Sequence, residues 1–488
     1  MNLNELTIEQ CHKGLKEKEF SSVDLTKACL QRISDVDEKL NAFVTVTENV
    51  ALKQAEEVDK KIAKGEQISP LTGIPCSLKD VFSTKGIETT ACSNILKGYV
   101  PPADASTVKK LKNEGMVLLG KTNTDEFTCG TSTESSCFGP TRTPWDLERV
   151  AGGSSGGPAA SIASHECIYG LGTDTGGSIR LPGAYCGIPG LKVSYGRVSR
   201  SGVISMASSL DSIGPMGKTV RDCAIILQTI AGKDVADSTT PDIEVPDYLS
   251  EIEKDVKGMT VGVPKEYFIK GLDDEIKQSV DDAVKQFEKL GMKVKEVSLP
   301  HTKYALAVYY VICPCEVSAN MARYDGIRFG PGPKESADDL MDYYVKARSQ
   351  GFGDELKRRI MTGTYALSSG YYDAYYLKAQ KVRSLVIKDY EEAFKEVDVM
   401  VAPIAPDLPF KVGEKVDDPL KLYLVDVLTT PVSVVGIPSL AVPSGVSKDN
   451  LPIGFQIIGP RFKEERVLQV GNAYEKAIGF REKYQPTL

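Results

Sequence analysis

Residues 151–183 read AGGSSGGPAASIASHECIYGLGTDTGGSIRLPG, and this stretch decides how the rest of the chain is interpreted. It holds two clusters of glycine and serine, at 152–157 and 172–178, with a mostly apolar segment between them. A flexible linker is one interpretation. The other is a pair of tight turns that bring serine hydroxyls and free backbone N–H groups to one point. We favour the turns, because a helix-like run and a buried-strand pattern at 166–172 separate the clusters.

Length and composition describe a globular chain. It has 488 residues, 41% hydrophobic and 26% charged, which allows two to four domains or one large domain with insertions. A net charge of −7 argues against the chain being the main binder of a nucleic acid. Residues 1–10 lack a basic and an apolar region, and no run of about 18 apolar residues occurs. We therefore expect no signal peptide, no membrane span and a cytoplasmic protein.

Cysteine and histidine usage bears on metals and redox state. The sequence has eleven cysteines, of which only Cys313 and Cys315 are closely spaced, and just three histidines. Without a second cysteine cluster or a nearby histidine, zinc is not expected. We predict reduced thiols that act as small core residues, and neither a metal nor a cofactor in this chain.

The order of apolar patterns predicts the fold class. Residues 1–66 have the periodicity of three amphipathic helices, with a capping-box spacing from Thr7 to Gln10. From residue 67 to 488, strand patterns alternate with helical ones. This predicts an α/β fold with a mixed central sheet covered by helices on both faces, and a helical N-terminal segment packed on the core. Residues 232–258 are expected to form a polar surface excursion, and residues 303–395 a helical, aromatic-rich region.

A serine nucleophile needs a base, and two bases are possible. His165 is the only histidine near the glycine and serine clusters, and it lies thirteen positions before Ser178. The residues around Ser178 do not follow the Gly-x-Ser-x-Gly pattern of a nucleophile elbow, however. The alternative base is a lysine whose pKa is lowered by burial or by neighbouring charges.

The motifs GGSSGG at 152–157 and GTDTGGSIRLP at 172–182 resemble the amidase signature. Within SLKD, residues 77–80, Lys79 matches the catalytic lysine of that family. The resemblance covers nearly the whole chain. It implies a Ser–cis-Ser–Lys mechanism with Ser178 as nucleophile, Ser154 as bridging serine and Lys79 as base, and a cis peptide before Ser154. Backbone N–H groups of Thr175, Gly176 and Gly177 would form the oxyanion hole, with Asp174 and Arg180 as structural partners beneath the turn.

Three further motifs, at 121–135, 325–330 and 358–376, are similar to those of the glutaminase subunits of tRNA-dependent amidotransferases. Glutamine is zwitterionic, so its pocket needs a cation and an anion. The resemblance implies that Arg358 binds the carboxylate and Asp426 the ammonium, with Tyr309 and Gly130 also in the pocket. Arg359 is an alternative to Arg358.

The same resemblance implies partner proteins. The chain would release ammonia from glutamine to convert Glu-tRNA(Gln) to Gln-tRNA(Gln), within a heterotrimer with a B and a C subunit. The B subunit would bind the tRNA and use ATP and Mg. A stand-alone amidase for small or aryl amides and a non-enzymatic scaffold subunit are the alternatives, and intact Lys79, Ser154 and Ser178 argue against the scaffold.

Overall fold

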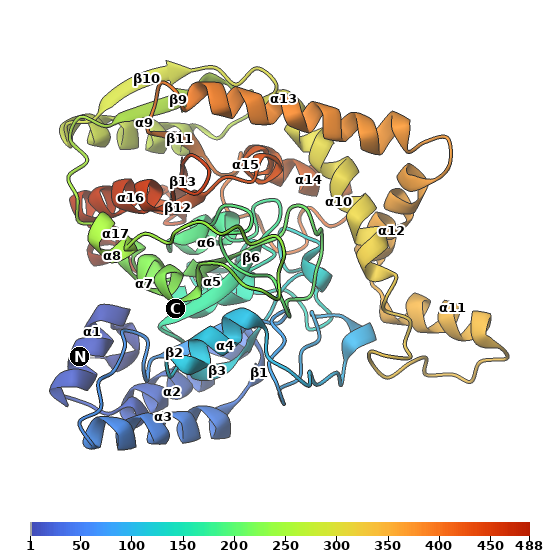
Figure 1. Cartoon of the computed structure of the whole chain (residues 1–488), viewed down its shortest axis with the longest axis horizontal. Coiled ribbons are helices and arrows are strands. Elements are labelled where there is room, and N and C mark those ends of the chain that lie inside the picture. The colour runs from blue at the N-terminus through green and yellow to red at the C-terminus, as the bar shows by residue number, and fades with distance from the viewer. Residues whose placement is uncertain (1) are drawn as a thin grey trace.

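A single large sheet organises the chain in the computed structural model, which describes residues 2–488 (Figure 1). Its eleven strands are mixed: β2 runs parallel to β3 and β6, whereas β8 runs antiparallel to β6. The predicted mixed sheet is thereby confirmed. In spatial order the strands are β1 (Phe43–Val46), β3 (Val117–Thr122), β2 (Pro75–Lys79), β6 (Tyr169–Asp174), β8 (Ser212–Met216), β7 (Gly190–Lys192), β12 (Ser439–Val446), β13 (Pro452–Ile458), β11 (Val399–Pro403), β9 (Thr260–Pro264) and β10 (Lys293–Val297).

Helices flank this sheet, as the alternating pattern predicts. A separate two-stranded hairpin joins β4 (Arg142–Thr143) to β5 (Asp146–Val150). The helices are α1 (Ile8–Glu17), α2 (Ser22–Leu40), α3 (Glu48–Ala63), α4 (Ser106–Asn113), α5 (Gly156–Ala163), α6 (Arg180–Cys186), α7 (Val220–Ile230), α8 (Tyr248–Glu251), α9 (Asp274–Lys289), α10 (Ala305–Met321), α11 (Leu340–Gly351), α12 (Asp354–Leu367), α13 (Lys378–Ala393), α14 (Pro419–Leu424), α15 (Thr430–Val435), α16 (Glu464–Ile478) and α17 (Phe480–Lys483).

The N-terminal segment is helical but not purely so. Thr7 and Ser21 cap α1 and α2 through complete capping boxes, which satisfy backbone N–H groups that a helix start leaves free. Between α2 and α3, the FVTV run forms β1 and pairs antiparallel with β3 at the edge of the main sheet. This strand lies between the second and third predicted helices, and its four residues are too few to show a clear periodicity in the sequence.

The segment 232–258 is more buried than its polar composition suggests. It contains the single-turn helix α8, and Tyr248, Ile252 and Val256 are buried in the main core. Residues 305–393 carry four long helices, α10 to α13, which Figure 1 shows in yellow and orange along one side of the molecule. Among residues 2–488, no helix has the length and apolar character needed to cross a membrane.

The sheet places the two halves of the site side by side. Strands β2 and β6 are adjacent and parallel, with Leu78 opposite Leu171. Lys79 is the last residue of β2 and Asp174 the last of β6. Since the carboxyl ends of parallel strands meet at one edge of a sheet, the turn that follows Asp174 lies beside Lys79.

Candidate active site

Lys79 is fully buried and surrounded by hydroxyl groups. Its Nζ donates to Ser154 Oγ at 2.7 Å, to Thr173 Oγ1 at 2.8 Å and to Ser155 Oγ at 2.9 Å. No carboxylate lies within 4 Å of this Nζ in the part of the chain that the structure describes. Removal from water therefore dominates and lowers the pKa of Lys79 to about 7, although Asp125 and Asp174 at longer range oppose the shift. A neutral amine is thus present near neutral pH.

Ser154 and Ser178 come from the two glycine clusters, and Ser154 contacts this lysine through its hydroxyl. The peptide bond between Gly153 and Ser154 is cis, as the family resemblance implies. The N–H of Ser155 donates to the carbonyl of Ser178 at 3.1 Å, which joins the two clusters through the backbone. Ser178 is slightly exposed, whereas Ser154 is completely buried. The backbone contact places Ser178 next to Ser155, and the hydroxyls of Ser154 and Ser155 contact the buried amine.

A buried ion pair supports the turn from below. Arg180 Nη2 lies 3.0 Å from Asp174 Oδ1, and both side chains are completely buried. The guanidinium also donates to the side chains of Ser433 and Gln456 and to the carbonyl of Thr429. Asp174 in turn accepts the backbone N–H of Ile179 at 3.1 Å. The predicted structural partnership of Asp174 and Arg180 is present, and it fixes the carboxyl end of the turn.

The histidine alternative finds no geometric support. His165 follows α5, and no hydrogen bond joins it to Ser178 among residues 2–488. Its Nδ1 is buried and has no hydrogen-bond partner. Burial, reinforced by the charges of Lys218 and Arg481, lowers the pKa of His165 to about 3. His165 instead lines a separate cavity.

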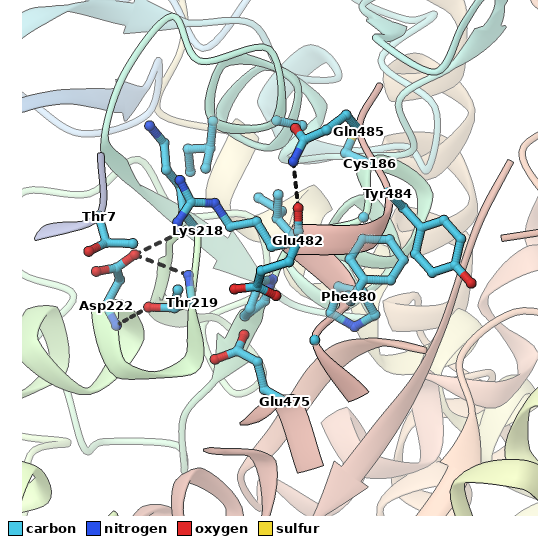
Figure 2. A pocket seen from close by; sticks show the side chains of 18 of the residues that line it. Thr7, Cys186, Lys218, Thr219, Asp222, Glu475, Phe480, Glu482, Tyr484 and Gln485 are labelled. Atoms are coloured by element: carbon cyan, nitrogen blue, oxygen red, sulfur yellow. Dashed lines mark hydrogen bonds between the residues drawn. The ribbon is translucent and has the colours of Figure 1, made fainter. Parts of the chain in front are cut away.

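That cavity, of about 500 Å³, lies between the C-terminal tail and the starts of α1 and α7. Figure 2 shows Lys218, Asp222, Phe480 and Tyr484 around it. Lys79, Ser154 and Ser178 do not line it. The cavity is therefore distinct from the site at the sheet edge.

A second group of charged and aromatic residues lies next to the glycine turn. Tyr310 donates to Asp426 Oδ2 at 3.1 Å and stacks on Tyr423, with ring centroids 4.2 Å apart. The guanidinium of Arg359 lies over both rings, 5.7 Å and 5.6 Å from their centroids. Burial raises the pKa of Asp426 to about 7, and the Arg359 charge opposes this shift. The group thus contains one buried cation and one buried carboxyl.

The structure places the two neighbouring arginines in different environments. Arg358 points to the surface and pairs with Glu355. Arg359 is buried, and its Nε donates to Glu355 Oε1 at 2.8 Å. Successive residues of a helix point about 100° apart, so only one of the two can face the aromatic group on the inner side of α12. The cation of this group is Arg359, the alternative to Arg358 that the sequence left open.

Tyr309 and Gly130 lie against the catalytic turns. A Cβ atom on Gly176 would come within 2.7 Å of the Tyr309 ring, so the ring packs directly on the turn. Tyr309 and Tyr310 meet edge to face at 5.0 Å, which connects the turn to the Asp426 group. Gly130 packs against Asp125, as does Gly153, and a side chain at either glycine would collide with that carboxylate.

Asp125 and Thr173 belong to the site although sequence reasoning did not select them. Asp125 is buried and accepts hydrogen bonds from Thr133 N and Ser135 Oγ, each at 2.9 Å. It holds the 125–135 loop against the cis peptide. Its place within the KTNTDEF motif, directly after a buried strand, was the available signal.

No group of three His, Cys, Asp or Glu residues suited to a metal ion occurs within residues 2–488.

Comparison with known proteins agrees with this geometry. A family model described as amidase matches residues 24–468. The chain therefore belongs to the amidase family, and the resemblance seen in the glycine and serine clusters is confirmed.

The names of relatives that match over nearly the whole length are more specific than the name of the family. A protein of Geotalea daltonii, named as the A subunit of glutamyl-tRNA(Gln) amidotransferase, is 54% identical over 98% of both chains. The crystal structure of a protein of the same name from Thermotoga maritima superposes with a TM-score of 0.82 at 42% identity, covering 98% of this chain and 95% of that one. A bacterial aryl acylamidase shares the fold with a TM-score of 0.85 at 26% identity, covering 98% and 97%.

Proposed function

We propose that this chain is the glutamine-hydrolysing subunit of a tRNA-dependent amidotransferase that converts Glu-tRNA(Gln) to Gln-tRNA(Gln). The observation that carries the proposal is the pairing of two groups at one sheet edge. One is a buried lysine bonded to serine hydroxyls, suited to amide cleavage. The other is a buried cation and carboxyl, suited to an amino acid. The names of the full-length relatives support the same conclusion.

In the proposed reaction, neutral Lys79 takes the proton of Ser154 as Ser154 takes that of Ser178. The Ser178 oxygen then forms a bond to the side-chain amide carbon of glutamine. Backbone N–H groups of Thr175, Gly176 and Gly177 stabilise the resulting oxyanion. Collapse of the intermediate breaks the C–N bond, and the proton held by Lys79 returns through the relay to the nitrogen, which leaves as ammonia. Water then hydrolyses the acyl-enzyme by the same relay, releasing glutamate.

The amino-acid end of glutamine would bind the Asp426 group. We assign its carboxylate to Arg359, whose guanidinium keeps N–H donors beyond the one used by Glu355. We assign its ammonium to Asp426, where it would supply the cationic partner that this buried carboxyl lacks within 4 Å among the described residues. Tyr309 would form the wall between this end and the turn, with Gly130 on the opposite side. These contacts would bind both charged groups of an amino acid, which simple aryl amides lack, and they therefore favour glutamine as the substrate.

Ammonia would pass to a B subunit that binds the tRNA and uses ATP and Mg, with a C subunit completing a heterotrimer in the cytoplasm. The relatives' names describe subunits, which supports the existence of partners. Large apolar side chains more than half exposed also gather on the helical region, where an interface would bury them. They include Leu340, Met341, Val345, Met361 and Tyr365.

The test is ammonia release from glutamine, measured for the chain alone and with co-expressed B and C subunits and Glu-tRNA. We expect activity that depends on the partners and is abolished by Ser178→Ala in a folded protein. His165→Ala is the control and should retain the rate. Undiminished activity of Ser178→Ala would refute the mechanism. Hydrolysis of aryl amides, but not glutamine, by the isolated chain would favour the stand-alone amidase.

A further inference from the structure

Asp211 reaches the glycine turn from a distant loop. Its Oδ1 accepts the hydroxyl of Thr175 at 2.7 Å across 36 positions of sequence. The same carboxylate accepts the backbone N–H of Met206 at 3.0 Å and that of Ala207 at 3.1 Å. Asp211 is therefore fixed by its own loop and offers a defined acceptor to Thr175.

This 205–211 loop is itself anchored to the helical region. Asn320 of α10 donates to the carbonyl of Met206 at 3.1 Å, and Glu316 of the same helix accepts the N–H of Ser209 at 2.8 Å. Arg383 of α13 donates to the carbonyl of Ser209 at 3.2 Å. Since α10 also carries Tyr309, the loop and the wall of the amino-acid site share one support.

Thr175 supplies a side-chain hydrogen bond that holds the turn on this side, next to the bond of 2.8 Å from Ser212 Oγ to the carbonyl of Asp174. Gly176 and Gly177 have no side chains, so they can form hydrogen bonds only through their backbone groups. On the far side, Asp174 accepts the N–H groups of Ile179 and Arg180. Oxyanion stabilisation requires donors preset at the position where charge develops, and a small error in their direction is costly. A hydrogen bond to an ionised carboxylate is among the stronger restraints available for this purpose.

We propose that Asp211 is a positioning residue for the oxyanion-binding turn, acting through the hydroxyl of Thr175 on the direction of the N–H groups of residues 175–177. The proposal rests on the proposed function of that turn. Asp211 touches no substrate atom in this scheme. Its contribution appears only when the oxyanion forms, so it affects kcat and leaves KM for glutamine nearly unchanged.

A double-mutant cycle tests this link. Asp211→Ala, Thr175→Val and the double variant are assayed in the assembled enzyme by ammonia release from glutamine. Each single change is expected to lower kcat by about tenfold or more, with KM within about twofold, as for loss of a hydrogen bond to a charged group. If the two residues act through their mutual bond, the double variant is no slower than the slower single variant. Thr175→Ser keeps the hydroxyl and should lose less than Thr175→Val.

Thr47→Val is the matched control, because it removes a hydroxyl bond of 2.8 Å to the carbonyl of Leu118, away from the site. It should leave kcat unchanged. A kcat within twofold of the parent for folded Thr175→Val, or multiplicative effects in the double variant, overturns the proposal. If Asp211→Ala does not fold, Thr175→Val still decides it. Ser178→Ala measured alongside separates the outcomes, since its retained activity refutes the proposed function rather than the role of Asp211.

Discussion

The titration of Lys79 gives the sharpest test of the mechanism. An ordinary lysine, with a pKa near 10.5, is about 0.1% neutral at pH 7.5. With its pKa lowered to about 7 by burial, Lys79 is about 75% neutral there, a gain of several hundredfold in available base. The base must be neutral to accept a proton, so the rate rises with pH and levels off above 7. Between pH 7.5 and pH 6, we expect it to fall about eightfold.

The assay must isolate Lys79 from Asp426, whose pKa is also about 7. The rate at which phenylmethanesulfonyl fluoride inactivates the enzyme serves this purpose, because that reagent reacts with the nucleophile without an ammonium for Asp426 to bind. The carboxyl groups that act on Lys79 are Asp125, Asp174 and Asp211. Burial raises the pKa of Asp211 to about 6, so this carboxyl changes charge in the same pH range and the apparent pKa belongs to the whole site.

Lys192 provides a matched control. It is equally buried, burial lowers its pKa to about 7 as well, and its Nζ donates only to the carbonyls of Val193 and Ile437. Lys79→Met should reduce glutaminase activity by about a thousandfold or more, whereas folded Lys192→Met should keep the pH profile of the parent. An inactivation rate that continues to rise beyond pH 9, or an active Lys79→Met enzyme, would refute the assignment of Lys79 as base.

Other expectations concern the amino-acid site and the support of the turn. Arg359→Ala should raise KM for glutamine by about tenfold or more, whereas Arg358→Ala, at the surface, should change it less than twofold; equal effects in steady-state kinetics would contradict the reassignment. Asp426→Asn should also raise KM, and the isosteric change should leave the melting temperature near that of the parent; an unaltered KM would remove Asp426 from the site. Arg180→Ala should destabilise the fold by about 3–5 kcal/mol, because Asp174 would remain buried without its cation, and a denaturant midpoint equal to that of the parent would contradict this.

Much of the fold follows from local patterns. The capping boxes at Thr7 and Ser21 and the helical periodicity of residues 8–63 predict α1 to α3, since helices are specified by contacts a few residues apart. Local patterns do not predict the short strands β1, β7 and β8. Their formation depends on pairing with strands that are distant in sequence, and a run of three to five residues has little periodicity of its own.

The sequence by itself pointed to amide hydrolysis, because the motifs that hold Lys79, Ser154 and Ser178 resemble the amidase signature. Only the tertiary structure decided which arginine packs on Tyr310 and Tyr423, because that depends on the rotation of α12 against its neighbours. It alone brought Asp211 to the glycine turn, because β8 pairs with β6 and carries the preceding loop there. Contacts of this kind form when distant strands pair and the faces of the sheet are buried, so they cannot be predicted from a local sequence pattern.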